Sequence, residues 1–191
     1  MTLIALALAA AATFQIDPSH SSTSFSVKHL VISTVRGQFD KTTGTVKLDD
    51  ADLAGSSVTA VIDANSIDTR EPKRDAHLKS PDFFDTAKYP EITFKSSKVS
   101  KTPAGYDVQG ALTLHGVTRP VTLAVEATPE IKGMGGEARR GFSASTKISR
   151  KQFGLAWNAA VEAGPVVGDE VAITLDIEAV KQQPAQAGGQ K

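Results

Sequence analysis

The sequence predicts an all-β fold, an antiparallel β-barrel of about eight strands with one short helical insertion. Three observations carry this prediction. Apolar residues recur at every second position through most of the chain, which is the period of a strand with one buried face. Turn signals separate these segments at short intervals. Gly37 and Gly44 fall inside one long segment, where glycine marks the bends that let a sheet curl closed.

The alternating segments follow one another along the chain. Val58, Ala60 and Ile62 share one face of the third segment. Apolar residues alternate in the same way along the last segment. Turn signals such as Ala104-Gly105 and His115-Gly116 separate neighbouring segments. We expect strands over residues 25–27, 35–48, 58–62, 92–94, 106–114, 121–125, 142–148 and 171–177, with a hairpin loop at 133–141.

One segment departs from the period of two. Residues 71–85 read EPKRDAHLKSPDFFD and contain Pro72 and Pro81, so they have room for only one or two helical turns. We interpret this segment as a single insertion in a β protein. Closing eight strands leaves an interior that side chains fill, or that holds one elongated small ligand.

Composition excludes several classes of function. The 191 residues include 21 Lys and Arg against 21 Asp and Glu, so no net charge recruits nucleic acid or an anionic bilayer. The absence of cysteine removes thiol nucleophiles, CxxC redox chemistry, thiolate zinc sites and disulfides. We therefore expect a globular protein held together by packing and strand pairing.

The two ends of the chain differ from its body. Residues 1–12, MTLIALALAAAA, resemble the apolar core and small-residue cleavage site of a secretory signal, although a basic start is missing. About twelve residues are too few to cross a bilayer, which needs ~20. We expect a signal peptide at 1–12, a barrel domain at 13–181 and a flexible tail at 182–191, and hence export to the periplasm without an integral membrane segment.

Catalytic and cofactor motifs are weak in this sequence. No GxSxG occurs, and the GxGxxA at 133–138 precedes a strand-like segment where a dinucleotide site needs a helix. The four histidines lie far apart and form no HxH or HExxH pair. We therefore predict no catalytic residue, no metal site and no cofactor.

Aromatic and basic residues gather around two segments. Phe83, Phe84 and Tyr89 lie in or after the insertion, and QFGLAW at 152–157 alternates large apolar residues. They line one cavity or form an ordinary core, and spacing alone leaves both open. Nearby basic residues are solvated turn charges, or they meet a polar head group at a cavity mouth.

Four segments together carry a family resemblance: FQIDPSHSSTSFSVKHLVISTVRGQF, IDTREPKRDAHLKSPDFFDTAKYPEITFKSS, ALTLHGVTRPVTL, and ISRKQFGLAWN followed by VGDEVAITLDIE. Over about residues 14–180 the sequence resembles the YceI-like family of periplasmic polyisoprenoid- and lipid-binding proteins. The resemblance implies a lipocalin-like, extended eight-stranded antiparallel β-barrel. Its apolar tunnel would hold a long isoprenoid or other lipid chain.

The resemblance also implies a site and a function. The protein would bind, store or transport a polyisoprenoid, quinone or related lipid without being an enzyme. Two alternatives remain: a lipid-modifying enzyme that uses His29, His77 and His115 with Asp75, and a stress-linked structural protein with a filled barrel. A homodimer also remains open. The expected tunnel residues are Phe83, Phe84, Ile92, Phe94, Leu112, Leu114, Phe142, Phe153, Leu155 and Trp157, and the expected head-group or rim residues are Arg74, His77 and Arg150.

Overall fold

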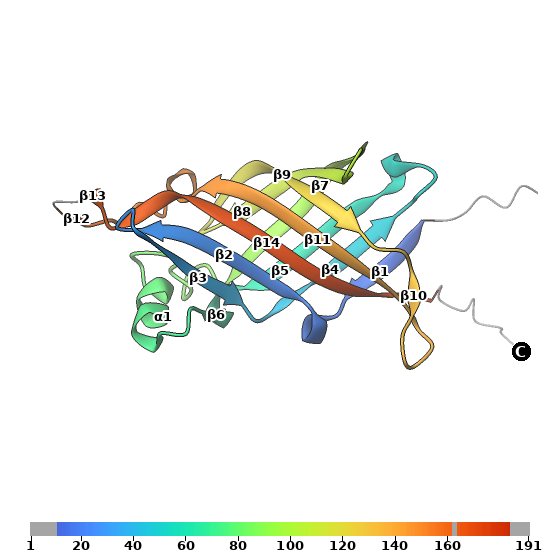
Figure 1. Cartoon of the computed structure of the whole chain (residues 1–191), viewed down its shortest axis with the longest axis horizontal. Coiled ribbons are helices and arrows are strands. Elements are labelled where there is room, and N and C mark those ends of the chain that lie inside the picture. The colour runs from blue at the N-terminus through green and yellow to red at the C-terminus, as the bar shows by residue number, and fades with distance from the viewer. Residues whose placement is uncertain (1–10, 162–163, 184–191) are drawn as a thin grey trace, which may run out of the picture.

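A single antiparallel sheet that closes on itself dominates the computed structural model, which describes residues 11–161 and 164–183 (Figure 1). Adjacent strands of the sheet run antiparallel. The strands of the sheet are β1 (Ala12–Ile16), β2 (Ser22–His29), β3 (Ser33–Phe39), β4 (Thr42–Leu48), β5 (Ser57–Asp63), β6 (Ile67–Asp68), β7 (Glu91–Thr102), β8 (Gly105–Leu114), β9 (Val117–Ala127), β10 (Ile131–Lys132), β11 (Ala138–Ser149) and β14 (Val167–Lys181). A separate two-stranded hairpin joins β12 (Ala160–Val161) to β13 (Gly164–Pro165).

Several of the shorter strands are halves of one long strand. β1 and β2 are separated by the 3-10 turn η1 (Pro18–His20), yet both pair with β14. On their other edge, β1 pairs with β4 and β2 pairs with β3. β5 and β6, separated by η3 (Ala64–Ser66), pair with β4 and β3 in turn. The eight long strands are therefore β1–β2, β3–β4, β5–β6, β7, β8, β9, β11 and β14, which confirms the predicted eight-stranded antiparallel barrel.

The last strand closes the barrel. β14 pairs with β11 from Arg139↔Val180 to Ser149↔Glu170. Its other edge pairs first with β2 and then with β1. Closure leaves the long strands with neighbours on both sides, so the backbone donors and acceptors of the sheet are used internally.

The bends of the barrel depend on glycine at close strand contacts. Gly44 has a φ of +152°, and a Cβ placed there would lie 2.1 Å from the carbonyl oxygen of Thr59 on β5. No other residue type allows β4 to approach β5 so closely. The long strand expected over residues 35–48 is in fact interrupted at Asp40 and Lys41, between the two glycines.

The helical insertion is α1 (Pro72–Lys79), which lies between β6 and β7 and confirms the single short helix. Pro72 occupies the first turn, where its missing N–H costs nothing, and the Glu71 carboxylate accepts a hydrogen bond from the backbone N–H of Lys73. α1 covers the barrel end that also carries the β2–β3 turn (Figure 1). Among the described residues, no helix has the length and apolar character needed to span a bilayer.

Several strand boundaries differ from the sequence prediction, among them those of β1, β7 and β11. β1 was not expected, because its five residues follow directly on the apolar leader and Ala12 was assigned to that leader. β7 runs eight residues beyond Phe94, to Thr102, since pairing with β8 holds a polar segment that has no clear alternation. β11 begins at Ala138, inside the expected loop. Residues 1–10 of the expected signal peptide and 184–191 of the expected tail lie outside the described residues.

Opposite α1, an ion cluster joins the ends of three strands. Nη1 of Arg139 donates to Asp17 at 2.9 Å and to Glu178 at 2.5 Å, and its Nε donates to Glu137 at 2.6 Å. His20 contacts the same oxygen of Asp17 that Arg139 does, with Nδ1 2.9 Å from Oδ2. Hydrogen bonds with His20, then Arg139 and the N–H of Ser19, lower the pKa of Asp17 from 3.8 to about 2.

This pKa predicts how stability depends on pH. Because the pKa of Asp17 is lower in the folded state, its stabilising effect is complete above about pH 4 and is lost as the pH falls towards 2. Asp17→Asn should therefore flatten part of the acid decline in the urea midpoint, measured from pH 6 to pH 2. Asp107→Asn on β8 is the control and should follow the wild type. Equal slopes for Asp17→Asn and the wild type would contradict the prediction.

Candidate functional site

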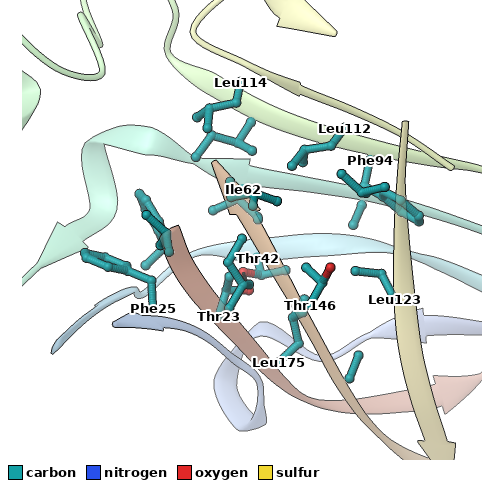
Figure 2. Close-up of a pocket in the computed structure, with 18 of the residues that line it drawn as sticks. Thr23, Phe25, Thr42, Ile62, Phe94, Leu112, Leu114, Leu123, Thr146 and Leu175 are labelled. Atoms are coloured by element: carbon teal, nitrogen blue, oxygen red, sulfur yellow. Dashed lines mark hydrogen bonds between the residues drawn. The ribbon is translucent and has the colours of Figure 1, made fainter. Parts of the chain in front are cut away.

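The barrel encloses a cavity of about 210 Å³. All eight long strands contribute side chains to its lining, and α1 and the segment after it contribute Leu78, Phe83 and Phe84. Figure 2 shows strand side chains of the lining, among them Leu112 and Thr23, converging from opposite walls of the barrel. β14 alone lines the cavity from Val167 to Ile177, which spans roughly 25 Å along the axis for a strand tilted by about 40°. The cavity is therefore long relative to its volume, and suits a narrow, extended ligand.

The alternation of the strands explains why the cavity is apolar. In the register of β11 with β14, Phe142 lies opposite Ile177 and Ala144 lies opposite Leu175, and all four side chains line the cavity. The residue between Phe142 and Ala144, Ser143, faces outward and is exposed. Closure of the barrel then gathers the inward faces of all the strands into one apolar surface.

Most of the expected tunnel residues meet in this lining. Two do not: Phe153 is buried in the core beside the cavity with 1% of its surface exposed, and Trp157 packs against the rings of His77 and Phe83, with centroids 5.0 and 5.1 Å away. The expected residues found in the lining are Phe83, Phe84, Ile92, Phe94, Leu112, Leu114, Phe142 and Leu155.

Sequence reasoning missed much of the lining. Val27, Val121 and Leu175 lie on strands that the alternation identified, but the alternation does not say which face of a strand is inside. Three threonines, Thr23, Thr42 and Thr146, also face the cavity. Thr146 falls within the strand expected over residues 142–148, and the sequence predicts no role for it.

An aromatic lid closes the α1 end of the cavity. Phe84 packs edge-on against Phe39, with ring centroids 5.6 Å apart, and Phe83 contacts Trp157. The backbone fixes this segment, because the N–H of Phe84 donates to the carbonyl of Leu78 at 2.9 Å. The lid therefore presents apolar rings to the cavity, and its polar backbone groups pair among themselves.

The expected rim residues are engaged within the protein. Arg74 donates from Nε to the Thr69 hydroxyl and from Nη2 to the Thr69 carbonyl, both at 2.8 Å. His77 Nε2 lies 2.8 Å from the Asp82 carboxylate. Neither side chain is part of the cavity lining. Local partners thus hold both groups outside the cavity lining.

Arg150 does reach the lining, and it is 4% exposed. Its guanidinium donates four hydrogen bonds to backbone carbonyls, those of Leu155, Trp157, Val167 and Gly168. Burial lowers its pKa below the ordinary value, and the charge of Asp169 acts in the opposite direction. Arg150 therefore ties two chain segments together at the α1 end of the barrel.

The histidines of the enzyme alternative have separate partners. His77 contacts Asp82, and His115 Nδ1 lies 3.3 Å from the carbonyl oxygen of Phe153. Asp75 accepts from the backbone N–H and hydroxyl of Thr69 instead of from a histidine. Among the described residues, the cavity lining contains no histidine and no carboxylate. This arrangement brings no acid–base pair to the cavity.

Known proteins share this sequence and this fold. Relatives described as UPF0312 proteins include one from Yersinia pestis, 39% identical over 175 residues that cover 91% of this chain and 88% of the relative. One from Yersinia enterocolitica is 38% identical over the same shares.

Solved structures resemble the barrel as well. BcnA from Burkholderia cenocepacia has a TM-score of 0.74 at 26% identity, covering 85% of this chain and 98% of that one. The YCEI protein of Campylobacter jejuni has a TM-score of 0.70 at 30% identity, covering 82% and 90%. A polyisoprenoid-binding domain from Saccharophagus degradans has a TM-score of 0.63 at 20% identity, covering 88% and 98%, and shows likeness of fold alone. The YceI-like domain matches residues 14–179, and this chain therefore belongs to the YceI-like family.

Proposed function

We propose that this protein binds a polyisoprenoid, quinone or related long-chain lipid inside the barrel and stores or carries it without transforming it. The single observation behind this proposal is the long apolar cavity under an aromatic lid. Transfer of each CH₂ group from water into such a cavity contributes about 0.8 kcal/mol. Several prenyl units therefore bind tightly by burial alone.

Two further features support this proposal over an enzymatic role. The described lining offers no nucleophile with an adjacent base, because its polar members are three threonines and Arg150. The Saccharophagus domain named for polyisoprenoid binding has the same fold, although likeness of fold does not transfer a ligand. We also propose that residues 1–12 direct export to the periplasm and that 13–181 form the working domain.

Reloading the protein with lipid tests the proposal. Purified protein is extracted with organic solvent, refolded and incubated with a long-chain prenol, and then measured by native mass spectrometry. We expect a complex of one lipid per barrel. Repeated preparations that show no stoichiometric lipid, natural or added, would overturn the proposed function.

The single tryptophan offers an independent readout in solution. Trp157 packs against Phe83, whose ring also lines the cavity. Lipid that enters beneath the lid should change the surroundings of Phe83, and so shift and saturate the Trp157 emission at one equivalent. Short-chain alcohols at the same concentration are the control, since they bury too few CH₂ groups to bind. An emission that stays constant while native mass spectra show bound lipid would contradict the placement of the ligand beneath the lid.

A further inference from the structure

Besides Arg150, three threonines are the polar residues of the otherwise apolar cavity. Thr23 on β2, Thr42 on β4 and Thr146 on β11 all line it, and we call these three the inner threonines. Figure 2 shows them among Leu112, Phe94 and other hydrocarbon side chains. Threonine and valine have nearly the same shape, so each hydroxyl is a polar group where packing needs only a methyl group.

The hydroxyls of Thr23 and Thr42 bond to each other and keep one hydrogen free. Their oxygens are 2.9 Å apart, and the residues are 4% and 1% exposed. In such a pair one hydroxyl donates and the other accepts, and the accepting hydroxyl still carries its own hydrogen. Among the described residues, neither hydroxyl has a second side-chain or backbone partner. One donor of the pair is therefore left without an acceptor within the described part of the chain.

The Thr146 hydroxyl has no hydrogen-bond partner within the described part of the chain. Its neighbours on the inward face of β11 are Ala144 and Ile148, and the residue opposite on β14 is Ile173. All three are apolar. An unpaired hydroxyl in apolar surroundings costs free energy, and a ligand that supplies a hydrogen-bond donor or acceptor to it removes that cost.

The basic residues near the cavity do not match a charged head group. Arg74 and His77 bond outside the lining, to Thr69 and Asp82. Four of the five N–H groups of Arg150 donate to backbone carbonyls. A diphosphate carries several anionic oxygens that need donors, whereas an alcohol or a carbonyl needs only one or two.

Given the function proposed above, we propose that the inner threonines hydrogen-bond an uncharged oxygen of the lipid, such as a prenol hydroxyl or a quinone carbonyl. The polar end of the ligand then lies inside the barrel and not at the rim. The site selects oxygenated, uncharged lipids over both hydrocarbons and diphosphates.

Three ligands with the same prenyl chain test this selection: the prenol, its deoxy hydrocarbon and its diphosphate. The variants are Thr146→Val and the double variant Thr23→Val/Thr42→Val. The control is Thr45→Val/Thr59→Val, which removes a hydroxyl pair of the same 2.9 Å separation on the outer face of β4 and β5. Affinities are read from Trp157 emission and native mass spectra.

We expect at least one inner variant to bind the prenol about fivefold more weakly, the loss of one hydrogen bond, while its affinity for the hydrocarbon stays unchanged or rises. The control should leave both affinities unchanged. The inference is overturned if both inner variants keep the wild-type ratio of prenol to hydrocarbon affinity, or if the diphosphate binds more tightly than the prenol. Failure of the wild type to bind any of the three ligands would instead overturn the proposed function itself.

Thermal unfolding of the lipid-free protein provides a second check. Thr146→Val should unfold at the same temperature as the wild type or higher, because it removes a hydroxyl that has no partner within the described residues. A clear fall in unfolding temperature would mean that the hydroxyl serves the fold, and would overturn its assignment to a ligand.

Discussion

Replacing Ala144 with tryptophan is expected to weaken lipid binding by roughly two orders of magnitude. Ala144 lies on the inward face of β11, between Phe142 and Thr146, and its methyl group lines the cavity. An indole ring there fills space that the lipid needs, and the close-packed walls cannot move aside at low cost. If the ring displaces about four CH₂ groups of the ligand, at ~0.8 kcal/mol each, the affinity falls by roughly two orders of magnitude. Titration of a prenol against the variant, followed by native mass spectrometry, measures the loss.

The adjacent position supplies a matched control. Ser145 is exposed on the outer face of the same strand, so Ser145→Trp adds the same ring one residue away and outside the barrel. It should bind lipid as the wild type does. Because the larger ring inside the barrel risks misfolding, Ala144→Phe is included, and circular dichroism must show the β spectrum for each variant. A folded Ala144 variant that binds lipid with wild-type affinity would contradict a ligand site inside the barrel.

The same alternation explains why so much of the fold was predictable. Residues 171, 173, 175 and 177 of β14 carry a period of two that no helix could satisfy, and every barrel built from such strands must bring one face inward. Length and turn signals then limited the architecture to about eight strands. The interruptions at η1, at Asp40 and at η3 were not predictable, since they depend on how each strand must bend to remain paired with both neighbours.

The rim of the site was harder to predict for a different physical reason. Arg74, His77 and Arg150 are long, charged or titratable side chains near an apolar end. The sequence left the basic residues there as solvated turn charges or as partners of a head group, and the family resemblance implied the head group. In the folded chain each finds nearer partners: Thr69, Asp82 and four backbone carbonyls. Such partners arise from tertiary packing, because buried or half-buried polar groups must be paired wherever the chain brings them together. The inner threonines were not predictable either, because threonine is common in strands and its spacing does not reveal that its hydroxyl faces a cavity.

Arg150→Met should destabilise the lipid-free protein by about 3 kcal/mol, measured as the free energy of unfolding in urea. Methionine retains the length and apolar stem of the side chain but removes every donor. The carbonyls of Leu155, Trp157, Val167 and Gly168 then lose a bond in a region that is largely shielded from water. Replacing a buried charge with an apolar side chain can be stabilising when its partner is replaced as well, but backbone carbonyls remain whatever the substitution.

Two comparisons separate this structural role from attraction of a ligand. Lys151→Met removes an exposed charge from the next residue, and it should leave the unfolding free energy within about 0.5 kcal/mol of the wild type. Arg150→Lys keeps the positive charge but offers a single ammonium in place of a planar fork, so it should recover only part of the loss. If Arg150 instead served chiefly to attract an anionic head group, the methionine variant would keep the stability of the lipid-free protein and lose affinity only for anionic lipids. Because the guanidinium donates to both the 155–157 and 167–168 segments, we expect the opposite order: stability falls first, and binding of every lipid weakens with it as the α1 end of the barrel loosens.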